Sequence, residues 1–221
     1  MEKIIMQVQD WPFLKTLSAE LAGFSLATDL MQCGTQYRIF TYHKTDSYRS
    51  FSVLYDQATK EFLVRVVIGL TEYCDVNFIT GSLQSLEQLL QARMEDVING
   101  LAKFNKNTLD SIFIEKKVLE WPYGAQLPRE IAGFVLYTAP TESVKFINGS
   151  YIIIDYCDFT MESNLIIYYN IYRDEFFGEI RIHRIPQMAA AFDAHTLPEL
   201  EAKLNTHLEQ TLKDMRLQLL Q

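Results

Sequence analysis

Runs of β-branched and aromatic residues dominate the middle of each half of this sequence, and their alternation with polar positions is typical of strands that bury one face. Four runs lie between residues 24 and 70, and four more lie between residues 134 and 182. Short polar segments, Asp56–Lys60 and Asn170–Asp174, are expected to be the hairpin turns before the last strand of each set. We predict strands at 24–28, 37–43, 51–55, 62–70, 134–138, 151–157, 165–171 and 176–182.

After each set of strands the period changes, because apolar residues then recur every three or four positions, as on one face of a helix. Thr196 and Glu199 have the spacing of a capping box, and Ser82 takes the place of Thr196 in the first half. A long helix is therefore expected to close each set. The predicted apolar stripes are Leu83, Leu86, Leu90, Met94, Val97 and Leu101, and then Leu197, Leu200, Leu204, Leu208, Leu212 and Met215.

The segments that precede the strands are harder to assign. Residues 4–8 and 112–118 are predicted as strands, with the tail of a helix as the alternative. A Trp-Pro pair then breaks the chain, because the residue before proline avoids helical geometry. Short helices are expected at 13–21 and 125–131, and Pro128 limits the second one to one or two turns.

The two halves are copies of one another. Trp11-Pro12-Phe13 returns as Trp121-Pro122-Tyr123, an offset of 121 − 11 = 110, and at that offset 9 of the 18 positions from 11 to 28 are identical. From Tyr37 onward the offset is 151 − 37 = 114, because the connection 139–150 is four residues longer than 29–36. The shared positions are mostly apolar, with a glycine and a proline. They therefore indicate a shared fold and not a shared active site.

We predict an α+β protein of two tandem repeats, 1–107 and 108–221, each with the order strand, short helix, four antiparallel strands, long helix. This order resembles the TATA-binding-protein-like fold, in which two such repeats share one saddle-shaped sheet. The resemblance covers nearly the whole chain and is one of topology. It implies one continuous domain with pseudo-two-fold symmetry, and a pair of separate helix-on-sheet domains remains the alternative.

If helices cover one face of the sheet, the other face is left for function. A period of two places Arg65 on that open face in the first repeat, and a mixed set of polar and aromatic residues in the second. Aromatic and arginine side chains contribute most to protein interfaces, so this face is the expected binding surface. A structural salt bridge among Glu179, Arg181 and His183 is the plainer interpretation. The candidate binding residues are Arg65, Tyr168, Asn170, Phe177, Glu179 and Arg181.

Composition narrows the classes of function. The 221 residues carry 20 basic and 28 acidic side chains, and both halves are acidic. Nucleic-acid binding is disfavoured, because phosphate contacts require a surplus of lysine and arginine. With 14 Phe, 12 Tyr and only 6 Pro, a disordered chain is excluded. Neither a signal peptide nor a long apolar span is apparent, so we expect a cytoplasmic protein with no membrane segment and reduced cysteines.

Motifs that carry chemistry are missing from the sequence. The three cysteines and four histidines have no metal-ligand spacing, and there is neither a glycine-rich phosphate loop nor a GxSxG motif. We therefore expect no cofactor and no metal, and a non-enzymatic binding or adaptor protein. Its open sheet face would hold another protein or a second copy of itself. The alternatives are a small-molecule binder or enzyme with a site between the repeats, a chaperone-like binder of a basic client, and a nucleic-acid binder.

Overall fold

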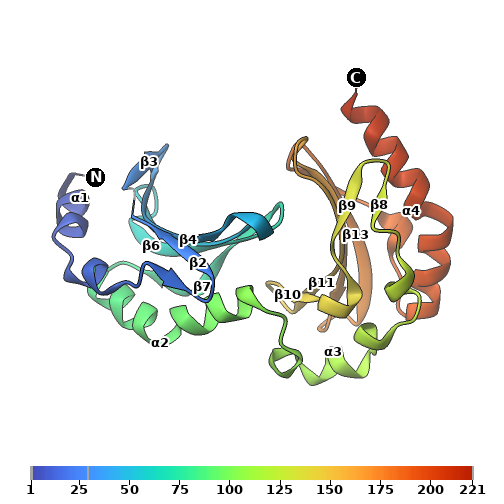
Figure 1. Cartoon of the computed structure of the whole chain (residues 1–221), viewed down its shortest axis with the longest axis horizontal. Coiled ribbons are helices and arrows are strands. Elements are labelled where there is room, and N and C mark those ends of the chain that lie inside the picture. Colours follow the sequence, from blue (N-terminus) through green and yellow to red (C-terminus); the bar gives the residue numbers. More distant parts are fainter. Residues whose placement is uncertain (1, 29, 221) are drawn as a thin grey trace. The chain divides into compact units, whose positions relative to one another are not determined.

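The computed structural model of the chain describes residues 2–28 and 30–220. The chain divides into two compact units, Met1–Lys103 and Phe104–Gln221. Each unit is α+β and has an antiparallel sheet of seven strands, so the predicted fold class is confirmed at this level (Figure 1). Each repeat thus has a sheet of its own, and not a share in one continuous sheet.

In the first unit the strand order is β1-β2-β4-β5-β6-β7, and the short β3 pairs with β4. In β6 the residues Phe62, Val64, Val66 and Ile68 are buried, as the period of two predicts, while Arg65 and Val67 between them are half-buried and Leu63 is buried as well. The elements are α1 Glu2–Gln9, η1 Pro12–Thr16, β1 Glu20–Leu21, β2 Phe24–Ala27, β3 Met31–Cys33, β4 Gln36–Lys44, η2 Thr45–Ser47, β5 Arg49–Asp56, β6 Glu61–Ile68, β7 Thr71–Thr80 and α2 Leu83–Ala102.

In the second unit the order is β14-β13-β12-β11-β9-β8, and the short β10 pairs with β11. Central strands β11 and β12 are buried along their whole length. The elements are η3 Lys106–Thr108, α3 Ser111–Glu115, η4 Val118–Glu120, η5 Gly124–Gln126, β8 Glu130–Ile131, β9 Phe134–Thr138, η6 Pro140–Glu142, β10 Val144–Lys145, β11 Ser150–Asp158, β12 Ser163–Asn170, β13 Glu175–Ile182, β14 Ile185–Met188, η7 Ala190–Phe192 and α4 Leu197–Leu219.

The long closing helices are where the sequence predicted them, and each packs on one face of the sheet in its own unit (Figure 1). The capping box of α4 is present, since the Thr196 hydroxyl accepts from the Glu199 N–H while the Glu199 carboxylate accepts from the Thr196 N–H. Ser82 caps α2 in the same way, accepting from the Ser85 N–H at 3.1 Å. The predicted stripe of α4 is the buried face that completes the core of the second unit: Leu200, Leu204, Leu208, Leu212 and Met215.

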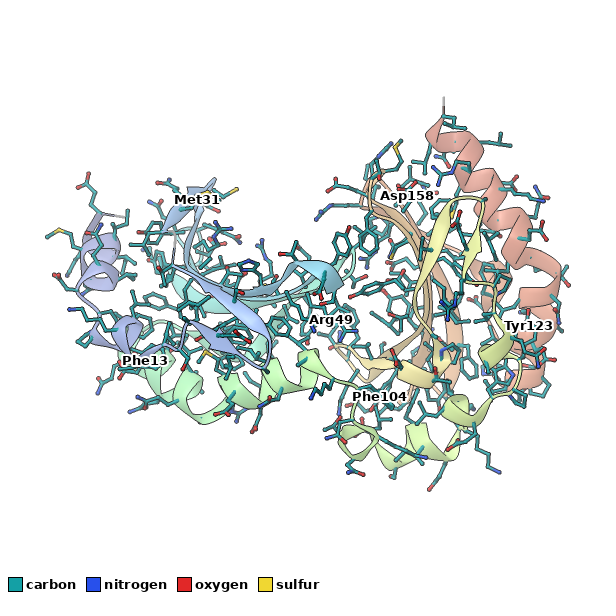
Figure 2. The ribbon with its side chains drawn as sticks, in the orientation of Figure 1. Phe13, Met31, Arg49, Phe104, Tyr123 and Asp158 are labelled. Atoms are coloured by element: carbon teal, nitrogen blue, oxygen red, sulfur yellow. The ribbon has the colours of Figure 1, made fainter. Side chains whose placement is uncertain are left out.

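The tryptophan that both repeats share makes the same contact in each unit. Trp11 Nε1 donates to Glu87 on α2 at 2.7 Å, and Trp121 Nε1 donates to Glu201 on α4 at 3.1 Å. Each bond ties the Trp-Pro segment to the closing helix, and Figure 2 labels the neighbouring rings, Phe13 beside α2 and Tyr123 beside α4. The repeat therefore preserves a scaffold, as expected from its mostly apolar identities.

A second repeated contact holds the strand that follows. The buried Tyr42 hydroxyl donates to the Ser18 carbonyl at 2.8 Å, and the Tyr156 hydroxyl donates to the Pro128 carbonyl at 2.7 Å. The Ala-Gly pair of each repeat forms a tight turn, with φ of +81° at the glycine in both copies. Positive φ favours glycine because it has no Cβ, which explains why this glycine occurs in both repeats.

The prediction of a strand before each Trp-Pro pair is wrong. Residues 2–9 form α1 and residues 111–115 form α3. In α1 the apolar residues Ile4, Ile5 and Val8 fall on one face only when the period is helical, while Met6 is 64% exposed.

The predicted short helices are also shorter than expected. Each is a single 3-10 turn, η1 or η5, followed by a two-residue strand, β1 or β8. The extra strands β7 and β14 were not predicted. Neither strand buries a continuous face, since β7 buries only Thr71 and Phe78 and β14 is exposed throughout, so their sequences lack the apolar alternation that identifies a buried strand. Within the described residues, no helix combines the length and the apolar character needed to cross a bilayer.

Candidate functional site

Four of the six predicted binding residues lie together on the second sheet, on the face opposite α4; we call this the open face of the second sheet. Tyr168 on β12 and Phe177 on β13 are directly paired, with stacked rings 5.0 Å apart. Arg181 Nε donates to the Glu179 carboxylate at 2.5 Å, and Arg181 Nη2 lies 3.4 Å from the Tyr168 hydroxyl. The expected salt bridge is present along one strand.

The remaining two candidates are elsewhere or already engaged. Arg65 belongs to the first unit, where its guanidinium donates to Gln36 Oε1 at 2.5 Å. Asn170 ends β12, and its whole amide is engaged: Oδ1 accepts from the Tyr172 and Arg173 N–H groups of the following turn. Nδ2 donates to the Asn148 carbonyl and to the Ser150 hydroxyl. His183 lies in the turn after β13 and is not part of the Glu179–Arg181 pair.

The longer connection of the second repeat folds onto this open face. Its residue Phe146 lies 6.0 Å from the Tyr168 ring, so three rings follow one another: Phe146, Tyr168 and Phe177. Together they cover the fully buried Ile152 and Ile166. Tyr168 is consequently only 3% exposed, and its ring supports the surface instead of lying on it.

Beside this aromatic stack lies a group of buried polar side chains. Asp155 on β11 is 1% exposed, and its Oδ1 accepts from Asn164 Nδ2 at 2.8 Å. Three oxygen atoms here have no hydrogen-bond partner among the described residues: Asp155 Oδ2, Asn164 Oδ1 and Thr138 Oγ1. Burial raises the pKa of Asp155 to about 6, against smaller lowering effects from Asn164, Cys157 and the charge of Arg181.

The backbone is irregular at the same place. Tyr156 pairs with Leu136 and the adjacent Asp155 pairs with Thr138, so Tyr137 is an extra residue, a β-bulge in β9. In the first unit the equivalent ladder is regular and pairs Thr41 with Ala27. One of the four extra residues of the second repeat therefore lies inside a strand, since 138 − 27 = 111 while the offset before it is 110.

The two repeats also differ in chemistry at this position. Thr41 stands where the second repeat has Asp155, and its hydroxyl pairs with the Ser52 hydroxyl at 2.9 Å. Ile166 stands in the place of Ser52, since 166 − 52 = 114, and it offers no hydrogen bond. A satisfied neutral pair in the first repeat thus corresponds to a buried carboxylic acid with an unpartnered oxygen in the second.

At one end of the open face, side chains of two connections form an exposed surface that we call the tip patch: Ile147, Tyr172 and Arg173. Tyr172 is 78% exposed and Ile147 is 38% exposed. The Tyr172 ring lies against Gly149, where an added Cβ would come within 2.5 Å of it. The Arg173 guanidinium lies 5.9 Å from the centre of the Phe177 ring and pairs with Glu175. The patch is therefore continuous with the aromatic stack.

The sequence pattern did not identify the tip patch, because residues 170–174 are also a typical solvated hairpin turn. The only available signal was the four-residue insertion, which supplies Ile147 and the phenylalanine beside it. The backbone of the turn is held firmly, since Asn170 Oδ1 accepts from two successive N–H groups at 3.0 Å each.

Other places for a ligand are less well formed. A shallow cavity of about 420 Å³ lies beside the start of α4 and is lined by Trp121, Leu197, Pro198, Glu201, Ala202 and Asn205. The Glu201 carboxylate in this lining already accepts a hydrogen bond from the Trp121 indole N–H. In the part of the chain that the structure describes, no three His, Cys, Asp or Glu side chains are grouped as a metal site requires.

Comparison of this chain with models of protein families, with curated proteins and with solved structures gave no match. The functional argument therefore rests on the side chains of the second sheet.

Proposed function

We propose that this protein is a non-enzymatic binding or adaptor protein and that the tip patch of the second repeat is its contact surface. The proposed partner is a segment of another protein that places an apolar side chain against Tyr172 and Ile147. The observation that carries the proposal is Tyr172 itself, a large aromatic side chain that is 78% exposed on a turn with a fixed backbone.

Two physical arguments support this choice. Tyrosine and arginine are enriched among the residues that dominate interface energies, and here they are adjacent at 172 and 173. A turn that is already ordered loses little conformational entropy on binding, so more of the contact energy is available as affinity. The buried Tyr168 ring and the partly buried Phe177 ring would support the patch from beneath.

The test is affinity capture with the full-length protein, followed by measurement of the dissociation constant for each captured protein. Tyr172→Ala is expected to weaken binding at least tenfold, because truncation of a central interface residue costs about 2 kcal/mol or more. The matched control is Leu217→Ala, which removes another exposed apolar side chain, 61% exposed on α4 of the same unit, and should leave binding unchanged.

Equal affinity of the wild-type and Tyr172→Ala proteins would refute the contact surface. A Tyr172-dependent change in the mass of the purified protein would replace the proposed partner with a second copy of this chain. The other functions predicted from the sequence, namely a ligand or active site between the repeats, chaperone-like binding of a basic client, and nucleic-acid binding, remain predictions.

A further inference from the structure

The buried group around Asp155 has an unusual imbalance of hydrogen-bonding groups. The three atoms without partners, Asp155 Oδ2, Asn164 Oδ1 and Thr138 Oγ1, are all oxygens that can accept hydrogen bonds. The Asn164 amide oxygen can only accept, and so can the Asp155 carboxylate while it is ionised. The Thr138 hydroxyl is also able to donate, but it has no partner within the described residues. Buried acceptors without a donor cost free energy, so this arrangement favours any species that supplies one.

The available space restricts what that species can be. Asp155, Asn164 and Thr138 are 1%, 0% and 2% exposed, so a bulky ligand cannot reach them in this packing. A proton needs no cavity. Protonation converts Asp155 from an acceptor into a donor and at the same time removes a buried negative charge.

The charged groups that face Asp155 do not neutralise it. On its own strand the nearest titratable group is Cys157, whose thiol is a weak donor. On β12 it faces Asn164 and Ile166, and on β9 it faces Thr138; none of these carries a charge. Arg181 on β13 contributes an attractive charge, but its guanidinium is bonded to Glu179 at 2.5 Å.

We propose that Asp155 is a built-in proton-binding site of the second repeat and that loss of this proton destabilises the folded second unit. The first repeat has no such site, because its equivalent residue is the neutral, paired Thr41. The inference does not depend on the proposed partner, since its readout is the pH dependence of folding.

The sign follows from linkage. The pKa of Asp155 rises from 3.8 to about 6 on folding, so the folded chain holds this proton more tightly than the unfolded chain. Stability from this group is therefore fully present below pH 3.8 and is lost as the pH rises through about 6. Across that window the folded-to-unfolded ratio of the second unit should fall by about a hundredfold from this group.

Carboxylates whose pKa is lowered act in the opposite direction. The carboxyl of Asp174, held by hydrogen bonds from Lys116 and Tyr169, is one of them. Such groups lose their contribution as the pH falls, below the window in which Asp155 titrates. Comparison of wild type with an Asp155 variant therefore isolates the Asp155 effect from theirs.

The experiment measures urea unfolding of the full chain from about pH 4.5 to pH 7.5, on either side of the raised pKa. The chain has two tryptophans, one in each unit, so a Trp11→Phe background leaves Trp121 to report on the second unit. Asp155→Asn keeps the shape of the side chain and carries its own donor. The difference in stability between wild type and Asp155→Asn is expected to fall as the pH rises toward about 6 and to stay constant above that value.

The matched control is Asp158→Asn on the same strand, because the Asp158 carboxylate is paired with Arg216 at 2.7 Å. This variant should lower stability but keep the decline that ends near pH 6. A second measurement, the carboxyl ¹³C titration of Asp155 in the unmutated protein, decides the question even if Asp155→Asn does not fold. A carboxyl that titrates near its ordinary pKa of 3.8, or a wild-type-to-variant difference that does not change with pH, would overturn the proposal.

Discussion

The hydroxyl of Tyr156 offers a clean test of the scaffold that the two repeats share. The Tyr156 ring is fully buried, and its hydroxyl donates a hydrogen bond to the Pro128 carbonyl at 2.7 Å. Tyr156→Phe removes that donor and keeps the ring. The loss should be about 1 to 2 kcal/mol, because a buried carbonyl is left without its partner.

Urea unfolding in the Trp11→Phe background measures this loss through Trp121. With a slope of about 2 kcal/mol per molar urea, the midpoint should fall by about 0.5 to 1 M while the slope is unchanged. The repeat supplies a matched variant: Tyr42→Phe removes the 2.8 Å bond to the Ser18 carbonyl and should cost the first unit a similar amount. Trp121→Phe provides the background for that measurement.

The reasoning fails if Tyr156→Phe leaves the midpoint unchanged or raises it. The occurrence of tyrosine in both repeats would then reflect packing of the ring and not the hydroxyl bond. A changed slope with a constant midpoint would point instead to a change in the extent of unfolding.

Three further predictions concern the second unit. Gly133→Ala should destabilise the protein by about 1 kcal/mol more than Gly23→Ala in thermal unfolding. Both glycines have φ of +81°, so the backbone strain is the same in the two variants. Only at Gly133 would the new Cβ also meet a side chain, at 2.6 Å from Arg216 Nη2. Equal losses would contradict this. Thr196→Ala should cost about 1 kcal/mol through loss of the α4 cap, measured by the same unfolding curves, and no loss would show that the cap is dispensable. Phe146→Ala should destabilise the second unit by about 2 kcal/mol and expose the tyrosine ring beneath it to chemical nitration; unchanged nitration would refute its covering role.

Much of the fold was accessible from the sequence because it depends on short-range periodicity. The alternation in Phe62–Ile68 identifies a strand whichever strands lie beside it. The capping residues of α4 lie three positions apart and act within one turn of helix. The internal repeat then supported each assignment, since every element was expected twice.

The segments that were misassigned are those whose local pattern is ambiguous. The apolar run Ile4–Val8 fits both a strand and one helical turn, and its helical state depends on burial of Val8. The edge strand Thr71–Thr80 exposes Glu72 and Val76, so its sequence gives no alternation; pairing with β6 makes it a strand.

The candidate site was predicted in part. The period of two correctly put Tyr168, Phe177, Glu179 and Arg181 on the same face, because side-chain alternation is a local property. The period of two could not show that Phe146, which lies 168 − 146 = 22 positions earlier in the chain, would cover Tyr168.

The sequence by itself determined the repeat, the α+β class, the closing helices and their caps, all of which follow from contacts between residues close in the chain. Only the tertiary structure decided which of the facing side chains are buried and which remain without a partner. Asp155 appears in the sequence as an ordinary acidic residue at the end of an apolar run. Its unpartnered oxygen arises because a bulge in β9 and two residues of β12, Ile166 and Asn164, meet around it, and β9 and β12 are the two strands on either side of β11.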